Sequence, residues 1–295
     1  MAQQSIVRSA DVPFARKGQA LSLALIGRIA AYIVLIIGGI TMVAPFFWMI
    51  STSLKNIATA QVFPPQLFPT NPLWSNYVEI FVRVPFARFI LNSFEITLIG
   101  VAGQLITTSM AGFAFARLRF WARDFWFVIL LSTLMIPNQV TLVPQYLIFK
   151  QLGWINTHLP LTVPFWFGGA FGTFLTRQFF LSIPQDLTDA AKVDGCNPLR
   201  MYWQISMPLA GPVLATLAVF TFMGRWNDLL GPLIYLNKID LMTVTIGISY
   251  FTGQYYSDMP LVMAASLVSV LPTLVLFIVA QKYFVQGVVL SGLKG

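Results

Sequence analysis

The sequence is poor in the residues from which most catalytic and metal sites are built. It holds one cysteine, Cys196, and one histidine, His158, among 295 residues. A single cysteine excludes an intramolecular disulfide, and a zinc site or a histidine-based catalytic centre would need more ligands than these. The patterns G-x-x-x-x-G-K-[S/T], G-x-S-x-G and H-E-x-x-H are also absent. We therefore expect no catalytic residues, no metal site, no bound cofactor and no ATP hydrolysis on this chain.

Charge is equally scarce. Only 9% of the residues are Asp, Glu, Lys or Arg, whereas soluble domains average about 25%. Hydrophobic residues make up 57% of the chain, and the mean hydropathy is +0.75. These values indicate an all-α polytopic membrane protein. The net charge of +8 would suggest a nucleic-acid partner in a soluble protein, but membrane topology explains it here, and we expect no nucleic acid.

Six mainly apolar stretches reach the roughly 20 residues that a helix needs to cross a bilayer. The first follows a basic region, as a signal peptide would. Its apolar run is too long for a signal core, however, and no small-x-small cleavage site follows, so we expect it to be retained. The predicted spans are approximately 29–50, 90–116, 124–144, 160–181, 208–236 and 261–281.

The distribution of Lys and Arg predicts the orientation. With the N-terminus inside, the cytoplasmic segments hold twelve of these residues and the external segments five, which favours cytoplasmic N- and C-termini. We interpret Arg117 and Arg119 as cytoplasmic anchors of the second span. The expected segments are a cytoplasmic tail (1–28), a first helix with an external loop (29–86), a transmembrane core (87–281) and a cytoplasmic tail (282–295).

The first external loop, 51–87, is rich in proline and should be extended and turn-rich. Residues 73–82 can form a short amphipathic helix on the membrane surface, with Trp74 and Tyr77 as interfacial anchors. A site for a partner protein and a plain connector are both compatible with this loop.

Two features inside the spans affect how the helices pack. Gly100, Gly103 and Gly112 in the second span, and Gly168 and Gly172 in the fourth, allow close helix approach. We favour packing within one subunit over a subunit interface. The third span contains Pro137 and Pro144, which should kink it. The kink can serve as a gate or only as a shape, and the sequence favours neither.

The most polar interruption in the second half of the chain runs from Ser182 to Pro208. Ser182 and Gln185 have the spacing of a capping box, which predicts a helix start. Gly195 should end that helix. Asn197 is a favoured N-cap and should begin a second helix that runs to Pro208. The local signals thus predict a helix, a tight glycine turn and a second helix.

This segment resembles the EAA loop of ABC importer permeases, in which E-A-A, three residues, Gly, nine residues and I-x-L-P follow one another. Every spacing matches, with Asp in place of Glu and Met207 in place of Leu. The resemblance implies the type I ABC importer permease fold and a cytoplasmic helix that docks into a separate ATPase. The alternative is an amphipathic loop helix on the membrane surface. The implied coupling residues are Asp189, Ala190, Ala191, Asp194, Gly195, Ile205 and Pro208.

The fifth predicted span carries polar residues at membrane depth. These are Arg225, Trp226, Asn227 and Asp228. Arg225 and Asp228 are three positions apart, so they can pair on one helix face. A self-neutralised structural pair and a polar lining of the translocation path are equally compatible with this pattern.

Short pieces of the chain also resemble the carbohydrate group of these permeases. They are residues 226–234, the Asn156-Thr157 pair and the tail from Gln281. This similarity points to the smaller six-span permease of maltose-type importers. It implies a sugar or oligosaccharide as substrate and a bacterial-type inner membrane, with lipid around the helices.

The same resemblance implies a set of partners. They are a related second permease chain in a heterodimer, two ATP-binding subunits that carry ATP and Mg, and an extracytoplasmic sugar-binding protein. The competing hypothesis is an ion-driven secondary transporter of a small polar solute. That class shows inverted repeats and buried carboxylates. Here only Glu95 and Asp228 lie near spans as acids, and no two-fold repeat is evident.

Overall fold

The computed structural model describes residues 16–253 and 257–292, and the side chains of residues 25–253 and 257–281. The chain divides into two compact units, of which the first ends at Ser51 and the second begins at Thr52. The regular structure of the described residues is helical, apart from one isolated bridge between Thr252 and Ser257. The predicted all-α class is therefore confirmed.

The first unit consists of the long helix α1 (Arg16–Ser53), whose last two residues belong to the second unit. Its stretch Leu25–Ser53 is long and apolar enough to cross a membrane. Apolar side chains occupy almost every position from residue 29 to 50, as a helix surrounded by lipid requires. The first predicted span is confirmed as a continuous helix.

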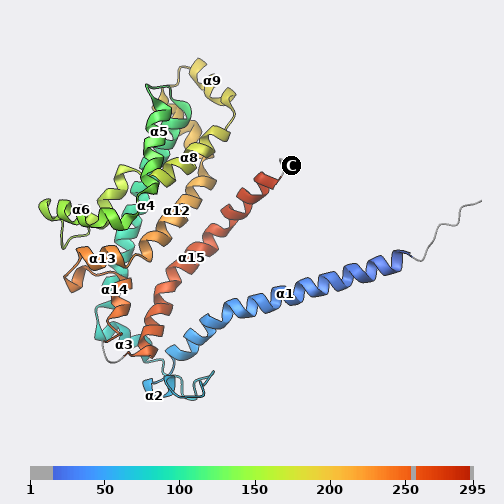
Figure 1. Ribbon diagram of the computed structural model, residues 1–295, viewed down its shortest axis with the longest axis vertical. Helices are drawn as coiled ribbons and strands as arrows, with labels where there is room; N and C mark the ends of the chain where they lie inside the picture. The colour runs from blue at the N-terminus through green and yellow to red at the C-terminus, as the bar shows by residue number, and fades with distance from the viewer. Residues whose placement is uncertain (1–15, 254–256, 293–295) are drawn as a thin grey trace, which may run out of the picture. The chain divides into compact units, whose positions relative to one another are not determined.

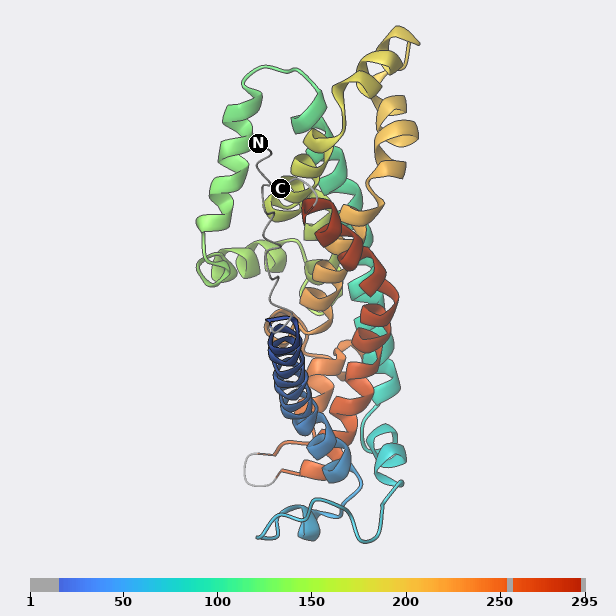
Figure 2. The same cartoon turned by 90° about the vertical axis from the view of Figure 1, so that its right-hand side faces the viewer.

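In the second unit, long helices run alongside one another, α9 lies at one end, and α2, α3 and α14 lie towards the other (Figure 1). Figure 2 shows α9 beyond the ends of α8 and α12 from a second direction. The helices are α2 (Ile57–Ala60), α3 (Asn76–Arg83), α4 (Phe86–Arg117), α5 (Arg123–Ser132), α6 (Asn138–Gln151), α7 (Leu159–Thr162), α8 (Ala170–Ser182), α9 (Gln185–Val193), α10 (Pro198–Met201), α11 (Met207–Leu209), α12 (Gly211–Trp226), α13 (Leu230–Tyr235), α14 (Val244–Ser249) and α15 (Met259–Gly292).

The second and sixth predicted spans are also continuous helices. Phe86–Arg117 and Met259–Gln281 are both long and apolar enough to span a bilayer. Within the described residues the structure holds three such helices, or up to five if each of two bent helix pairs counts as one span. The other three predicted spans depart from a straight helix.

The predicted span 124–144 is wrong as a single helix. It breaks after the short 3₁₀ segment Thr133–Met135, and the axes of α5 and α6 differ by 98°. Ile136 is extended and Pro137 precedes the first residue of α6. A residue before proline is driven out of the helical region by the proline ring, so Pro137 produces a corner where we expected a kink.

The fourth and fifth predicted spans are shorter than expected. In the region 160–181 only α8, with 13 residues, is a long helix, and α7 and a 3₁₀ segment (Val163–Phe167) precede it. In the region 208–236, α12 ends at Trp226 and α13 begins at Leu230. The helical run Pro198–Leu209 meets α12 at 79°. Short helices and corners replace the uniform spans expected from hydropathy.

Helices α4 and α8 approach closely through glycine. A Cβ atom added at Gly112 would lie 2.8 Å from the backbone nitrogen of Arg177. One added at Gly172 would lie 2.9 Å from Cγ2 of Thr108. At this approach the Thr176 hydroxyl donates a 2.9 Å hydrogen bond to the carbonyl of Thr108. The predicted small-residue packing within one subunit is confirmed at these positions.

Buried apolar residues form a main cluster at each end of the second unit. The cluster at the α9 end joins α4, α8, α9, α10 and α12, and contains Phe113, Ala116, Phe180, Ala191, Met201, Tyr202, Ala210 and Val213. The cluster at the other end contains Ile80, Phe86, Phe89, Phe222, Trp226, Val244, Phe251, Leu261, Ala264 and Ala265. The polar segment 182–208 is thus supported by a core of its own.

The loop before α4 is only partly as predicted. A short helix does form, as α3, and Trp74 before it is 69% exposed. The Tyr77 hydroxyl, however, lies 2.8 Å from the Ser53 hydroxyl and its ring packs on the apolar cluster. Tyr77 therefore connects α3 to the start of the second unit and is not an interfacial anchor.

Candidate coupling loop and polar cleft

Helix α9 begins without the predicted capping box. The Ser182 hydroxyl donates instead to the carbonyl of Phe179, at the end of α8. The N-cap position of α9 is occupied by Pro184, which provides no side-chain cap. The prediction failed because Ser182 still belongs to α8, where a serine hydroxyl can bond to a carbonyl three or four residues back.

The end of α9 is as predicted. Gly195 has a φ of +74°, a conformation that costs most other residues roughly 1 kcal/mol or more. The amide of Cys196 then donates to the carbonyl of Ala191 at 2.9 Å. The Asn197 side chain accepts from the amide of Arg200 at 2.8 Å and so caps the next helix. The predicted helix, glycine turn and helix are confirmed.

The second helix of the loop differs in detail. It continues to Leu209, one residue beyond the predicted end, and contains a π-helical segment, Tyr202–Ser206. Such segments concentrate at functional sites. Ile205 packs against the apolar cluster at this end, whereas Pro208 is exposed.

The two alanines of α9 differ in exposure. Ala191 and Thr188 are 5% and 4% exposed and pack against this chain. Ala190 is exposed, together with Leu187 and Val193 at helical spacing. Of the two alanines assigned to coupling, Ala190 therefore faces outward, whereas Ala191 packs inside this chain.

The exposed surface of α9 also carries negative charge. Asp186, Asp189 and Asp194 are all exposed. The Lys192 ammonium donates a 2.8 Å hydrogen bond to Asp189 and, as the main cause, lowers the pKa of that carboxyl. Asp189 is therefore ionised at neutral pH. The outward surface combines an apolar stripe with carboxylates.

A cleft of about 350 Å³ lies among α6, α7, α12 and α13. The charged residues Arg225 and Asp228 line it, and their closest side-chain atoms are 3.5 Å apart. The Arg225 guanidinium also lies 4.2 Å from the centre of the Phe165 ring. We call this the polar cleft. Its other lining residues are Asn138, Thr141, Leu142, Gln145, Pro160, Leu161, Pro164, Leu230, Gly231, Ile234 and Tyr235.

Asp228 also organises the backbone beside the cleft. Its carboxylate accepts from the amide of Gly231 at 3.1 Å, and its carbonyl accepts from the Thr245 hydroxyl at 2.8 Å. The pair with Arg225 forms between the end of α12 and the turn that follows it. Arg225 and Asp228 are therefore paired with each other, and both line the polar cleft.

The other two residues assigned to the path lie elsewhere. Trp226 is 1% exposed, stacks on Phe222, and donates from Nε1 to the carbonyl of Ser269 at 2.9 Å. Asn227 is exposed and donates to the carbonyl of Met223. Trp226 therefore packs in the core, and Asn227 is not among the lining residues of the polar cleft.

Sequence reasoning missed the contribution of α6 to the polar cleft. Asn138, Thr141 and Gln145 supply amide and hydroxyl groups, and the Gln145 amide donates to the Thr141 hydroxyl at 3.2 Å. Their spacing of three and four residues places them on one helix face. The polar neighbours of Pro137 were the available signal, but the corner that turns α6 towards α12 was not foreseen.

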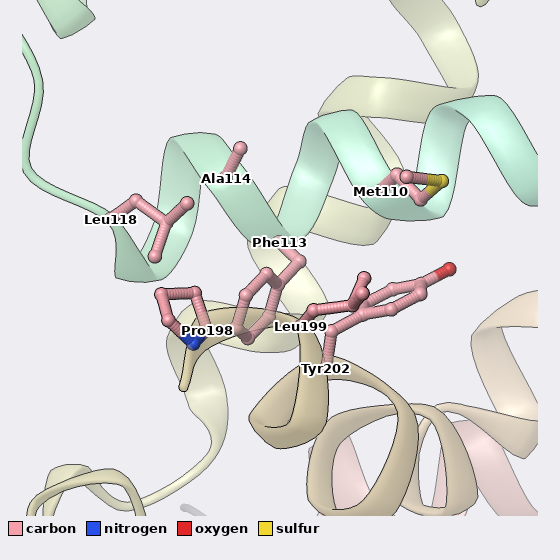
Figure 3. A pocket seen from close by; sticks show the side chains of 7 residues that line it. All are labelled: Met110, Phe113, Ala114, Leu118, Pro198, Leu199 and Tyr202. Atoms are coloured by element: carbon pink, nitrogen blue, oxygen red, sulfur yellow. The ribbon is translucent and has the colours of Figure 1, made fainter. Parts of the chain in front are cut away.

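A second cavity, of about 260 Å³, separates α4 from the second helix of the loop (Figure 3). Its lining side chains are Met110, Phe113, Ala114, Leu118, Pro198, Leu199 and Tyr202. Almost all of this lining is apolar, and the Tyr202 hydroxyl is already paired with Ser109 at 2.7 Å. This cavity therefore does not suit a hydroxyl-rich solute, whereas the polar cleft does.

Comparison with known proteins decides the family. Residues 104–289 match the family described as "Binding-protein-dependent transport system inner membrane component". The chain belongs to this family. The match includes α9, the loop around it and the residues of the polar cleft.

Three relatives cover most of the chain. The lactose transport system permease protein LacG of Rhizobium radiobacter is 32% identical over 88% of this chain and 94% of its own length. The arabinooligosaccharides transport system permease protein AraQ of Halalkalibacterium halodurans is 31% identical over 83% and 86%. The sn-glycerol-3-phosphate transport system permease protein UgpE of Pectobacterium atrosepticum is 32% identical over 88% and 95%.

A solved structure shares the fold. It is the crystal structure of a bacterial ABC transporter involved in the import of the acidic polysaccharide alginate, with a TM-score of 0.78 and 23% identity. The match covers 92% of this chain and all of that one. This identity is low, so the similarity supports the type I importer permease fold and no substrate.

The chain is thus a multi-pass inner-membrane permease subunit of an ABC importer, of the carbohydrate-uptake group. It is not itself catalytic, and no cofactor is expected on permeases of this family. It works with an ATPase and a binding protein. The competing hypothesis of an ion-driven secondary transporter is therefore wrong. The resemblance of the tail falls partly on residues 293–295, which lie outside the described residues.

Proposed function

We propose that this chain forms half of the translocation pathway for a sugar or oligosaccharide. A related permease would supply the other half, and two ATP-binding subunits and an extracytoplasmic sugar-binding protein would complete the importer. The names of the relatives, which include lactose and arabinooligosaccharide permeases, support the substrate class. The excess of Lys and Arg in the cytoplasmic segments supports cytoplasmic termini.

The coupling element in this proposal is α9. One face of this helix, with Thr188 and Ala191, is buried on the chain's own core, and Leu187, Ala190 and Val193 are exposed outside it. An exposed apolar stripe on a polar helix is the pattern that a groove on a partner accepts. The single observation that carries the proposal is this exposed apolar stripe, which includes Ala190 of the EAA-like motif.

The test is to place a bulky side chain on the stripe. Ala190→Trp should prevent the helix from entering a groove, so the ATPase should be lost when the complex is purified through this chain. Ala58→Trp is a matched control, because Ala58 is also an exposed alanine on a short helix, at the other end of the second unit. The control should retain the ATPase, and both variants should be inserted in the membrane.

A second variant addresses the turn behind α9. Gly195→Val places a β-branched residue at a φ of +74°, which disfavours the turn by roughly 1 kcal/mol or more. Transport and ATP hydrolysis should both fall, while ligand binding by the separate binding protein should be unchanged. If Ala190→Trp and Gly195→Val both assembled and transported like the parent, the loop would be a passive connector.

We also propose that the polar cleft lines the solute path. A paired charge, the amides of Asn138 and Gln145, and the ring of Phe165 give hydrogen-bonding groups beside an aromatic face. Clefts with a few convergent polar groups on a largely apolar wall are the usual form of a small-molecule site.

A further inference from the structure

Arg117 joins three helices at the cytoplasmic end of the predicted topology. It is the last residue of α4, and sequence reasoning assigned it only to anchoring the span. Its Nη2 donates to the carbonyls of Phe180 and Ile183, at the end of α8. Its Nη1 donates to Oε1 of Gln185 at 2.7 Å and to the hydroxyl of Thr188 at 3.4 Å, both on α9.

These contacts attach the first turn of α9 to the ends of α4 and α8. A cation near the last carbonyls of a helix is favourable, and at α8 the guanidinium adds a bond to the Phe180 carbonyl and one to the Ile183 carbonyl. On α9 it bonds to the side-chain oxygens of Gln185 and Thr188. Only a guanidinium has the fixed fork of donors to reach four acceptors, since a lysine ammonium is a single point.

Helix α4 extends from these contacts to the polar cleft. It is continuous for 32 residues. A Cβ atom added at Gly100 would lie 3.7 Å from Cγ of Arg225 and 3.7 Å from the ring of Phe165. One rigid helix therefore touches the coupling helix at its end and the charged pair of the polar cleft along its length.

We propose that Arg117 is a positioning residue that holds α9 in a fixed orientation on α4 and α8, so that a movement imposed on α9 is passed along α4 to the polar cleft. The inference rests on the proposed docking of α9 with the ATPase. It makes the bonds between Arg117 and α9 the first contacts through which this chain transmits the movement. The ATPase would act on Arg117 only by moving α9.

The test compares Arg117→Lys with Arg119→Lys in the complete importer. The first variant keeps the charge and removes the fork. Arg119 is exposed two residues further on and serves as the matched control. Amide hydrogen exchange should be about tenfold faster in 185–193 of Arg117→Lys, which corresponds to the loss of about one net hydrogen bond to a charged group. Substrate transported per ATP hydrolysed should fall several-fold, with the ATPase still bound, and Arg119→Lys should match the parent.

A second variant tests the same contact from the other side. Gln185→Ala removes an exposed side chain, so folding should be unaffected. It should accelerate exchange of α9 less than Arg117→Lys does, and the two effects should not add, because they remove one shared bond. Additive effects would contradict the contact.

Failure of this inference can be separated from failure of the proposed function. Suppose that Arg117→Lys and Arg119→Lys have the same amide hydrogen exchange rate in α9 and transport the same amount of substrate per ATP. The positioning role of Arg117 is then overturned, even if Ala190→Trp loses the ATPase. If Ala190→Trp retains the ATPase, docking through α9 is wrong, and the transmitting role of Arg117 is overturned with it.

Discussion

The close approach of α4 and α8 gives a sharp prediction at Gly112. A Cβ atom at this position would lie 2.8 Å from both the backbone nitrogen of Arg177 and Cβ of Thr176, and closer still to the Thr176 hydroxyl. Real Cβ contacts of this kind essentially never fall below 3.0 Å. Two of the three atoms belong to the backbone or next to it, so no rotamer change relieves the clash. Gly112→Ala must push α4 and α8 apart.

The expected cost is about 1–3 kcal/mol, the usual range for one extra methyl group in a packed core. Separation would also weaken the bond from Thr176 to the carbonyl of Thr108, which is 2.9 Å long. Gly224→Ala is the control, because a Cβ there meets nothing within 4 Å inside this chain. An added alanine in a helix is otherwise favourable by up to about 1 kcal/mol.

The single cysteine provides the assay. Cys196 is half-buried against the apolar cluster at the α9 end, so a fluorogenic maleimide should report its exposure as the purified complex is heated. Gly112→Ala should melt well below the parent, and Gly224→Ala should melt with it or above. Thr176→Ala should rescue Gly112→Ala only in part, because the clash with Arg177 persists. If Gly112→Ala melted with the parent, the close approach of the two helices would be refuted.

Two further predictions concern topology and the charged pair. A cysteine at the exposed position Thr70 should react with an impermeant thiol reagent from outside intact cells, and Cys196 should not; the reverse pattern would sink the proposed orientation. Asp228→Ala should lower expression or transport, because it leaves Arg225 without its partner at 3.5 Å, and the double change with Arg225→Ala should be milder than the sum of the single changes by about 1 kcal/mol or more. Strict additivity in a thermal-stability measurement would remove the pairing.

Local signals carried much of the correct prediction. Gly195 and Asn197 act through their own backbone conformation and through bonds to residues at most five positions away. The spans at α1, α4 and α15 follow from uninterrupted apolar runs. In a bilayer such a run is stable as an α-helix, which satisfies its own backbone hydrogen bonds. Such features depend on neighbours in the chain, and a sequence displays its neighbours directly.

The predictions from sequence failed at residues that could end one helix or begin the next. Ser182 has the spacing of an N-cap, yet it lies inside α8 and bonds back to Phe179. Pro137 was expected to kink a helix, but it separates two helices at 98°, and this corner leaves Asn138, Thr141 and Gln145 of α6 on the wall of the polar cleft. Hydropathy does not distinguish a kinked helix from a corner, because it averages the composition of the segment and ignores the direction of the chain.

The sequence by itself determined the class of the protein, three of its continuous spans, the helix–turn–helix of the EAA-like loop and its family. Tertiary structure alone decided that Ala190 faces outward and Ala191 inward, that Trp226 belongs to the core, and that Arg117 reaches α8 and α9. These facts depend on which residues distant in the chain come together. Arg117 and Gln185 are 68 positions apart, so their hydrogen bond depends on tertiary packing that no local signal in the sequence displays.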